Sequence, residues 1–320
     1  MPKPTAAVHR YCSRVFTTEE LDSIRDLISA NANHNRAELS RIVCDLVSWF
    51  GPDGRRKDMS CRVAMLRMHR DGLIELPLPR NGNRNGKCGA PRTLWGEPGE
   101  PITKPVEQLE ELHLLRVNSA ADSGMWNELI DRYHYLGYHP LPGAQLRYLA
   151  FSGNRVLAAL GFGSSAWKVG PRDEFIGWSV EQRVDKLALV VNNARFLILP
   201  WVESQNLASR LLSMVARQLP LHWEARYGYR PVLLETFVEQ RFRGTCYRAA
   251  NWIHVGKTQG RGKLDRHRHS EIPVKEIFLY PLRRDFREQL RGLEPGAGRQ
   301  NDRSKSADRR QGGDRVTTRS

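Results

Sequence analysis

The stretch VVNNARFLILPWVESQNLASRLL, residues 190–212, decides the fold of the larger part of this chain. Its first half belongs to an apolar run, 187–199, which predicts a long strand. After a polar loop, apolar residues recur at helical spacing over 207–219 and predict a helix. A strand followed by an amphipathic helix is the repeating unit of α/β proteins, so the stretch predicts an α/β sheet.

Elements of both kinds continue on either side of this stretch. Before it lies a predicted hairpin, 145–162, in which a Ser-Gly-Asn turn separates two apolar runs. After it, apolar strands alternate with a short helix. The pattern predicts a mixed-sheet α/β domain over 106–293, with further helices at 124–135, 172–187 and 245–251, and strands at 231–238, 252–255 and 277–282.

Three helices are predicted ahead of this domain. The first begins at Thr17 and the second at Asn35, and each of these caps has a glutamate three residues later, as in a capping box. The third is capped by Ser60, and a strand-like piece, 73–76, follows it. This order predicts a winged helix-turn-helix over 1–79, with an ordinary three-helix bundle as the alternative.

The third of these helices would be the recognition helix, which lies in the major groove of DNA in such domains. Its predicted outward side chains are basic, and a basic tripeptide lies just before it, where phosphates would pass. In the alternative, the basic face only keeps the protein soluble. The predicted DNA contacts of this head are Arg55, Arg56, Lys57, Arg62, Arg67 and Arg70.

Composition indicates a polyanion as the partner. The formal net charge is +15 and the pI is near 10, an imbalance that usually accompanies nucleic-acid binding. No helix with a lysine-rich polar face points to a membrane surface instead, and no apolar run is long enough to span a membrane. The first residues do not form a secretion signal, and the five cysteines contain no CxxC pair. A cytoplasmic protein with reduced thiols is therefore expected.

Two segments are expected to lie outside the packed domains. Residues 80–105 are rich in Gly, Asn and Pro, which indicates a linker or an extended wing. Residues 294–320 contain almost no apolar side chains and predict a disordered basic tail.

The α/β domain resembles the GNAT-type acyltransferases. The similarity lies in 196–202 with the following helix, and in the segment CYRAANWIHVG, 246–256. The resemblance implies a pyrophosphate cradle at the start of that helix, where the family has two glycines. This chain has Glu203, Asn206 and Ala208 at those positions, and the side chains are expected to crowd and repel a pyrophosphate. Acetyl-CoA is therefore not expected as a cofactor.

Longer motifs resemble the DruA family, whose members belong to the Druantia anti-phage system or accompany transposases. The motifs are RYHYLGYHPLPGAQLRY, RDEFIGWSVEQR, VVNNARFLILPWV, LLETFVEQRFRGTCYRAANWIHVGKTQGRGK and IFLYPL. The resemblance implies action on DNA, in defence or in mobile elements. It also implies a helicase or a transposase as a partner protein.

A glycine-punctuated basic loop, 257–263, follows one of the predicted strands. Its amides and cations could hold phosphate, although it lacks the spacing of a nucleotide-hydrolysing loop. The alternative is an exposed basic loop. Cations and aromatic residues also alternate just before it, as in grooves that bind a nucleic-acid backbone. The predicted contacts here are Arg243, Arg248, Lys257, Arg261 and Lys263.

Two carboxylates and an imidazole are candidates for catalysis. Glu235 lies in an otherwise apolar strand, where a carboxylate must be paired or functional. Together with Asp173 and His134 it could support phosphodiester cleavage, with a divalent metal on the two carboxylates. The alternative is a set of ion pairs with Arg172, Arg183 or Arg195. Tyr247 or Cys246 could instead act as a nucleophile on DNA, although a core position is the alternative for this tyrosine.

These observations predict a DNA-binding protein of an anti-phage or transposon module, with DNA cleavage as a candidate activity. One alternative is a non-catalytic subunit that recognises DNA for a partner helicase or transposase. The other alternative is a GNAT-type acyltransferase.

Overall fold

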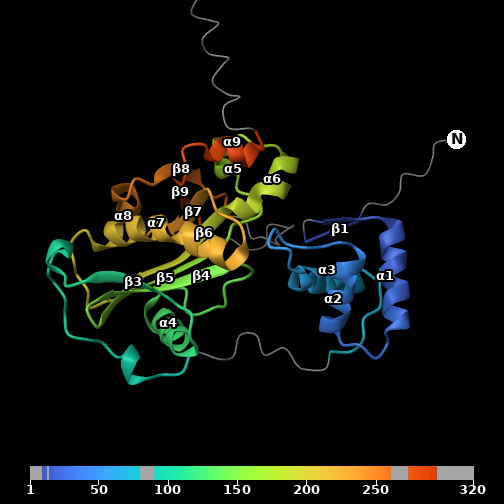
Figure 1. The fold of residues 1–320 in the computed structure, drawn as a ribbon, viewed down its shortest axis with the longest axis horizontal. Coiled ribbons are helices and arrows are strands. Elements are labelled where there is room, and N and C mark those ends of the chain that lie inside the picture. The colour runs from blue at the N-terminus through green and yellow to red at the C-terminus, as the bar shows by residue number, and fades with distance from the viewer. Residues whose placement is uncertain (1–8, 13, 80–89, 261–272, 294–320) are drawn as a thin grey trace, which may run out of the picture. The chain divides into compact units, whose positions relative to one another are not determined.

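The computed structural model describes residues 9–12, 14–79, 90–260 and 273–293 (Figure 1). The chain divides into two compact units. The first contains the described parts of 1–163 together with 195–230, and the second those of 164–194 and 231–320. Each unit is described by itself. The tail beyond residue 293 and the loop residues Arg261 and Lys263 lie outside the described residues.

The N-terminal head contains three helices, as predicted: α1 (Thr18–Ala30), α2 (Arg36–Leu46) and α3 (Asp58–Arg70). The capping boxes at Thr17 and Asn35 are confirmed, because each side chain accepts from the backbone while the glutamate three residues on bonds back. Helix α3 begins at Asp58, before the predicted Ser60 cap.

The predicted wing is not confirmed. Residues 73–76 form no strand, and among the described residues of the head the strands are β1 (His9–Tyr11) and β2 (Arg14–Phe16), which form a hairpin ahead of α1. Side chains occupy backbone groups that a partner strand would otherwise use. His69 contacts the carbonyl of Ile74 and the amide of Leu76, and Arg25 donates to the carbonyl of Leu73.

The hairpin closes the hydrophobic core of the head. Phe16 at the end of β2 is 1% exposed and meets the ring of Trp49 edge-on, with centroids 5.7 Å apart. Side chains from all three helices complete this core: Leu21, Ile24, Leu39, Val43, Cys44, Cys61, Ala64, Met65 and Met68.

A seven-stranded mixed sheet confirms the α/β prediction. Its strand order is β3-β4-β5-β6-β7-β9-β8. The predicted hairpin 145–162 is β4 with β5, which pair antiparallel, whereas β6 is parallel to β7. The strands are β3 (Leu112–Arg116), β4 (Gln145–Ser152), β5 (Arg155–Ser164), β6 (Val190–Ile198), β7 (Leu233–Glu239), β8 (Ile253–Lys257) and β9 (Lys275–Pro281).

The helices of this domain follow the predicted order, with three differences, one of which is α9 (Phe286–Arg291), a helix that the sequence did not predict. The helix predicted over 207–219 is α7 (Leu207–Tyr227), which continues past Pro220 because its buried stripe extends to Trp223 and Tyr227. The single helix predicted over 172–187 is two short helices. In the second unit α5 and α6 lie together with α9 (Figure 1). The remaining helices are α4 (Ala120–Tyr133), α5 (Gly170–Ile176), α6 (Val180–Lys186), α8 (Thr245–Ala249) and α9 (Phe286–Arg291).

Part of the predicted linker is held against α4. The buried carboxylate of Glu128 accepts bonds from the backbone amide of Thr93 at 2.8 Å and from its hydroxyl at 2.6 Å. The hydroxyl of Tyr133 donates to the carbonyl of Gly96 at 2.7 Å. Residues 93–96 are therefore fixed to the first unit.

Candidate functional site

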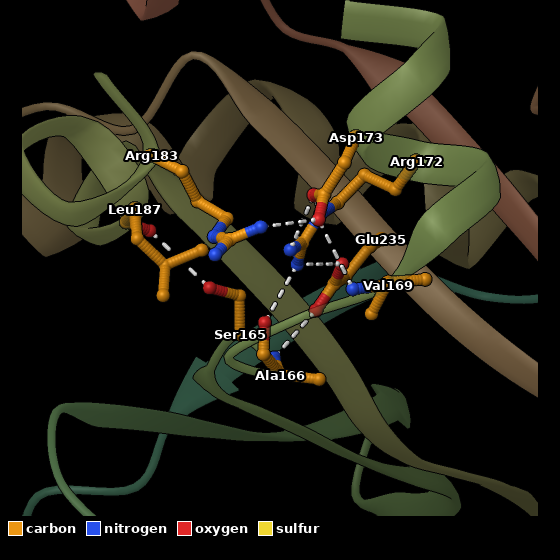
Figure 2. A network of polar contacts seen from close by, with 8 residues as sticks. All are labelled: Ser165, Ala166, Val169, Arg172, Asp173, Arg183, Leu187 and Glu235. Atoms are coloured by element: carbon orange, nitrogen blue, oxygen red, sulfur yellow. Dashed lines mark hydrogen bonds and ion pairs between the residues drawn. The ribbon is translucent and has the colours of Figure 1, made fainter. Parts of the chain in front are cut away.

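A buried network of two arginines and two carboxylates occupies the second unit (Figure 2). Arg172 on α5 is fully buried, and its Nη1 donates to Oε2 of Glu235 and to the carbonyl of Ala166, both at 2.8 Å. Its Nε and Nη2 donate to Oδ1 of Asp173 at 2.9 and 2.8 Å. Arg183 on α6 donates to the other carboxylate oxygen of Asp173 at 3.1 Å.

Strand pairing fixes Glu235 in this network. It lies on β7 in register with Asn192 of β6, and its side chain is fully buried. Its second oxygen, Oε1, accepts from the amide of Ala166 at 2.9 Å. Burial raises the pKa of Glu235, while Arg172 and the Ala166 amide act in the opposite direction. Two positive and two negative groups thus balance each other, and each carboxylate has an arginine partner.

The structure therefore gives the predicted metal carboxylates a different role. Asp173 and Glu235 are both bonded to Arg172, as in the ion-pair alternative of the sequence. Within residues 9–12, 14–79, 90–260 and 273–293, no group of three or more His, Cys, Asp or Glu side chains could hold a metal ion. A divalent metal held by the two carboxylates alone stays a prediction.

Tyr247 lies on α8 as a buried aromatic residue. Its hydroxyl donates to Oδ1 of Asn193 at 2.8 Å, and Thr236 on β7 donates to the carbonyl of Asn193 at 3.1 Å. The ring packs against Phe278, with centroids 5.8 Å apart. Burial raises the pKa of the neighbouring Cys246 thiol. These contacts are those of the core alternative rather than of an exposed nucleophile, and the sequence did not indicate Asn193 or Thr236 as partners.

His134 belongs to the first unit, at the C-terminal end of α4. Its Nδ1 accepts from the amide of Leu136 at 3.2 Å, and its ring stacks on Tyr135 with centroids 4.7 Å apart. This hydrogen bond and this ring contact stabilise the turn after α4. The role predicted for it in catalysis stays a prediction.

Ion pairs neutralise half of the predicted DNA contacts of the head. Arg55 lies 4.0 Å from Asp53, Arg56 lies 2.6 Å from Asp45, and Arg62 lies 3.5 Å from Asp58. Residues 9–79 contain eleven Lys and Arg against ten Asp and Glu. The head as a whole is therefore close to neutral, and most of the excess charge lies elsewhere in the chain.

The other three predicted DNA contacts of the head differ from these. In the part of the chain that the structure describes, Lys57, Arg67 and Arg70 contact no carboxylate. Lys57 and Arg70 are exposed at the two ends of α3. The basic character predicted for α3 is thus concentrated in these three side chains.

The second predicted set of cations surrounds α8. Arg243 and Arg248 are exposed, and Arg248 stacks over Phe278 at 5.1 Å. Lys257 is paired with Glu276 at 3.0 Å. Two exposed arginines thus remain here as candidate backbone contacts.

Among the described residues, every helix is too short or too polar to span a bilayer.

The comparison with family models identifies one match. The model described as Druantia protein DruA matches residues 67–272. This range begins inside α3 and includes nearly all of the sheet. None of the curated proteins matches the chain.

Several solved acetyltransferases are similar to the chain at low identity. Spermidine N-acetyltransferase from Vibrio cholerae, in complex with CoA and spermine, is 8% identical and has a TM-score of 0.36 over 54% of this chain and 96% of that chain. An acetyltransferase from Bacillus subtilis in complex with CoA is 6% identical, with a TM-score of 0.34 over 53% and 99%. The putative acetyltransferase yncA from Salmonella typhimurium, with acetyl-CoA, is 11% identical, with a TM-score of 0.29 over 44% and 66%.

These neighbours contradict one expectation from the sequence. Acetyl-CoA was not expected as a cofactor because of Glu203, Asn206 and Ala208, yet the three similar structures hold CoA or acetyl-CoA. Side chains at three loop positions are not a sufficient ground for that expectation, because backbone amides rather than side chains bind a pyrophosphate at a helix start.

Proposed function

Because this chain belongs to the DruA family of Druantia proteins, we propose that it is a DNA-binding component of a bacterial anti-phage system that recognises DNA without cutting it. The recognised DNA would pass to a partner helicase or transposase. The observation that carries the proposal is the set of cations on α3 that contact no carboxylate in the described chain, Lys57, Arg67 and Arg70.

Their position supports a role in phosphate contact. An arginine that serves only solubility or stability can be paired with a nearby carboxylate, as Arg55, Arg56 and Arg62 are. A cation at a helix surface with no carboxylate beside it instead attracts phosphate, and its contact with DNA releases the counterions that the DNA had condensed. Arg243 and Arg248 near α8 would add contacts of the same kind in the second unit.

The proposal that this protein does not cleave DNA rests on the ion-pair network. Arg172 donates to both carboxylates that cleavage would use, and Glu235 is fully buried. A carboxylate in this setting stabilises the fold rather than a reacting phosphate. Incubation of the purified protein with plasmid and with single-stranded DNA in Mg²⁺ should leave both intact; strand cleavage by the wild type would contradict this part.

Charge reversal on α3 tests the binding part. The triple variant Lys57→Glu, Arg67→Glu and Arg70→Glu is expected to weaken binding to duplex DNA at least about tenfold at low salt, because three phosphate contacts become repulsive. Fluorescence anisotropy over a range of salt concentrations measures both the affinity and the salt slope, and this slope should become shallower in the variant.

A matched control separates local contact from net charge. The triple variant Lys168→Glu, Arg210→Glu and Arg217→Glu changes the formal charge equally, at exposed positions outside α3. It should keep most of the affinity and the wild-type salt slope. Equal losses in the two triple variants would indicate only nonspecific attraction, and unchanged affinity in the α3 variant would remove α3 from the proposal.

A second candidate function is acyl transfer, which the start of α7 favours. Asn206, the residue before this helix, has a left-handed conformation, and its side chain makes no capping hydrogen bond. In the described part of the chain no side chain caps this helix, and the Leu207 amide donates to the carbonyl of Ser204 at 3.3 Å. The next amides of the first turn could bind a pyrophosphate group. When bound, acetyl-CoA would supply the activated acyl group.

Isothermal titration with acetyl-CoA tests this candidate. Binding in the micromolar range is expected if the start of α7 holds the cofactor, and inorganic pyrophosphate should compete with it, because both would use the same amides. A titration without heat, supported by an unchanged melting temperature in excess acetyl-CoA, would dismiss acyl transfer.

A further inference from the structure

The turn between β7 and α8 carries an exposed aromatic ring. Phe242 is 45% exposed, whereas the aromatic side chains of Tyr247 and Trp252, further along the chain, are buried at 7% and 4%. The backbone amide of Phe242 donates to the carbonyl of Glu239 at 2.9 Å, and the guanidinium of Arg241 lies over the ring, 4.9 Å from its centroid. The turn thus holds this ring at the surface of the second unit.

Two arginines follow the ring on a backbone that is held in place. Gly244 has a φ of 64°, and a Cβ atom there would lie 2.9 Å from the ring of Phe278, so this position requires glycine. Its carbonyl accepts from the amide of Arg248 at 3.2 Å. The guanidinium of Arg248 lies over the same ring of Phe278, 5.1 Å from the centroid. Phe242, Arg243 and Arg248 therefore belong to one short segment whose backbone packing fixes.

These two arginines keep a positive charge available at the surface. Glu239, at the end of β7, pairs through one oxygen with Arg241 at 3.2 Å and through the other with Lys275 at 3.5 Å. In the part of the chain that the structure describes, no carboxylate forms an ion pair with Arg243 or Arg248, and both arginines are exposed. A phosphate that meets them therefore breaks no ion pair.

We propose that the segment 242–248 binds a single strand of nucleic acid, with the ring of Phe242 stacked on a base and the guanidinium groups of Arg243 and Arg248 on phosphates. An aromatic ring stacks on any unpaired base, and cations beside it follow the backbone. A base within a duplex is already stacked on its neighbours, so the ring favours a single strand. This inference rests on the proposed function for the choice of DNA as the ligand, but it uses no residue of α3.

The combination of ring and cations carries the inference, because an exposed apolar side chain alone is common on protein surfaces. Trp95 in the first unit is 75% exposed, yet Glu97 and Glu100 follow it closely in the chain. Carboxylates repel a phosphate backbone, so the surroundings of Trp95 do not favour nucleic acid. Trp95 is therefore a suitable control for Phe242.

Fluorescence anisotropy with a labelled oligothymidylate of about 15 nucleotides tests the site in the full chain. Phe242→Ala is expected to weaken binding about fivefold or more, because one base loses its stacking partner. This factor should stay the same at every salt concentration, since stacking releases no counterions. Phe242→Trp should bind at least as tightly as the wild type, and Trp95→Ala should bind as the wild type does.

The arginines predict a different response to salt. Arg243→Gln and Arg248→Gln should each make the slope of log affinity against log salt shallower by about 0.7, because each removes one phosphate contact with a single strand. Phe242→Leu keeps an apolar side chain without an aromatic face and should lose as much affinity as Phe242→Ala. The three positions are exposed, so every variant should melt as the wild type does, which separates a loss of binding from misfolding.

Failure of this site and failure of α3 give different results. Phe242→Ala should leave the affinity for a duplex unchanged, and the triple variant of α3 should bind oligothymidylate as its charge-matched control does. Full oligothymidylate affinity in Phe242→Ala, or an equal loss in Trp95→Ala, overturns this inference and leaves the α3 proposal standing. An oligouridylate of the same length is titrated in parallel, and tighter binding of this RNA would assign the site to RNA instead of DNA.

Discussion

Replacing Arg172 with alanine is expected to lower the free energy of unfolding by about 3–5 kcal/mol, the usual cost of breaking a buried ion pair from one side. The substitution leaves Glu235 fully buried without its arginine and takes two hydrogen bonds from Asp173. Chemical denaturation followed by circular dichroism measures the change. Because Arg172 joins α5 to β7, the loss should also appear as a lower unfolding midpoint of the second unit.

Comparison with two further variants shows whether the loss of stability comes from the broken ion pair. Arg172→Met combined with Glu235→Leu removes the charges together and should recover most of the stability, because an apolar pair of similar volume replaces a desolvated one. Arg243→Ala, at an exposed arginine, should change stability by no more than about 0.5 kcal/mol. If Arg172→Ala costs less than about 1 kcal/mol, Glu235 is protonated in the native protein and the ion-pair description is contradicted.

The network also marks how far the sequence could predict the candidate site. A carboxylate in the apolar run LLETFVE indicates a paired or functional acid, and this inference needs only the local pattern. The identity of the partner depends on the fold, because Arg172 is separated from Glu235 by 63 residues. The register of β6 and β7 and the packing of α5 bring the two together, and no local pattern specifies either.

The head also combines features that a local pattern predicts with features that depend on the fold. Helices α1 and α2 begin where the sequence predicts because their caps are local hydrogen bonds at Thr17 and Asn35. The wing was predicted from a short apolar run, 73–76, but a strand needs a partner, and side chains occupy several of its backbone groups instead. Likewise, a count of arginines on α3 could not reveal that Arg62 is paired with Asp58, one turn away.

The second large effect is expected in the segment predicted as a linker, residues 80–105. Glu128→Ala is expected to lower the free energy of unfolding by about 2–3 kcal/mol, because one buried carboxylate accepts both bonds from Thr93 and pairs with Arg132 at 3.0 Å. Arg132 also reaches Glu97 at 2.6 Å, so loss of Glu128 loosens both ends of the turn. Limited proteolysis should then cut within 91–100 faster than in the wild type, and mass spectrometry identifies the cut.

Close packing at Gly96 provides an independent variant of the same contact. A Cβ atom added at Gly96 would collide with the carboxylate of Glu128, so Gly96→Ala should displace the turn although every polar group is retained. Glu107→Ala, at an exposed glutamate just beyond this segment, is the matched control and should alter neither stability nor cleavage. A flexible linker would respond to none of these substitutions. Equal proteolysis of the wild type, Glu128→Ala and Gly96→Ala would therefore restore the linker interpretation that the sequence composition favours.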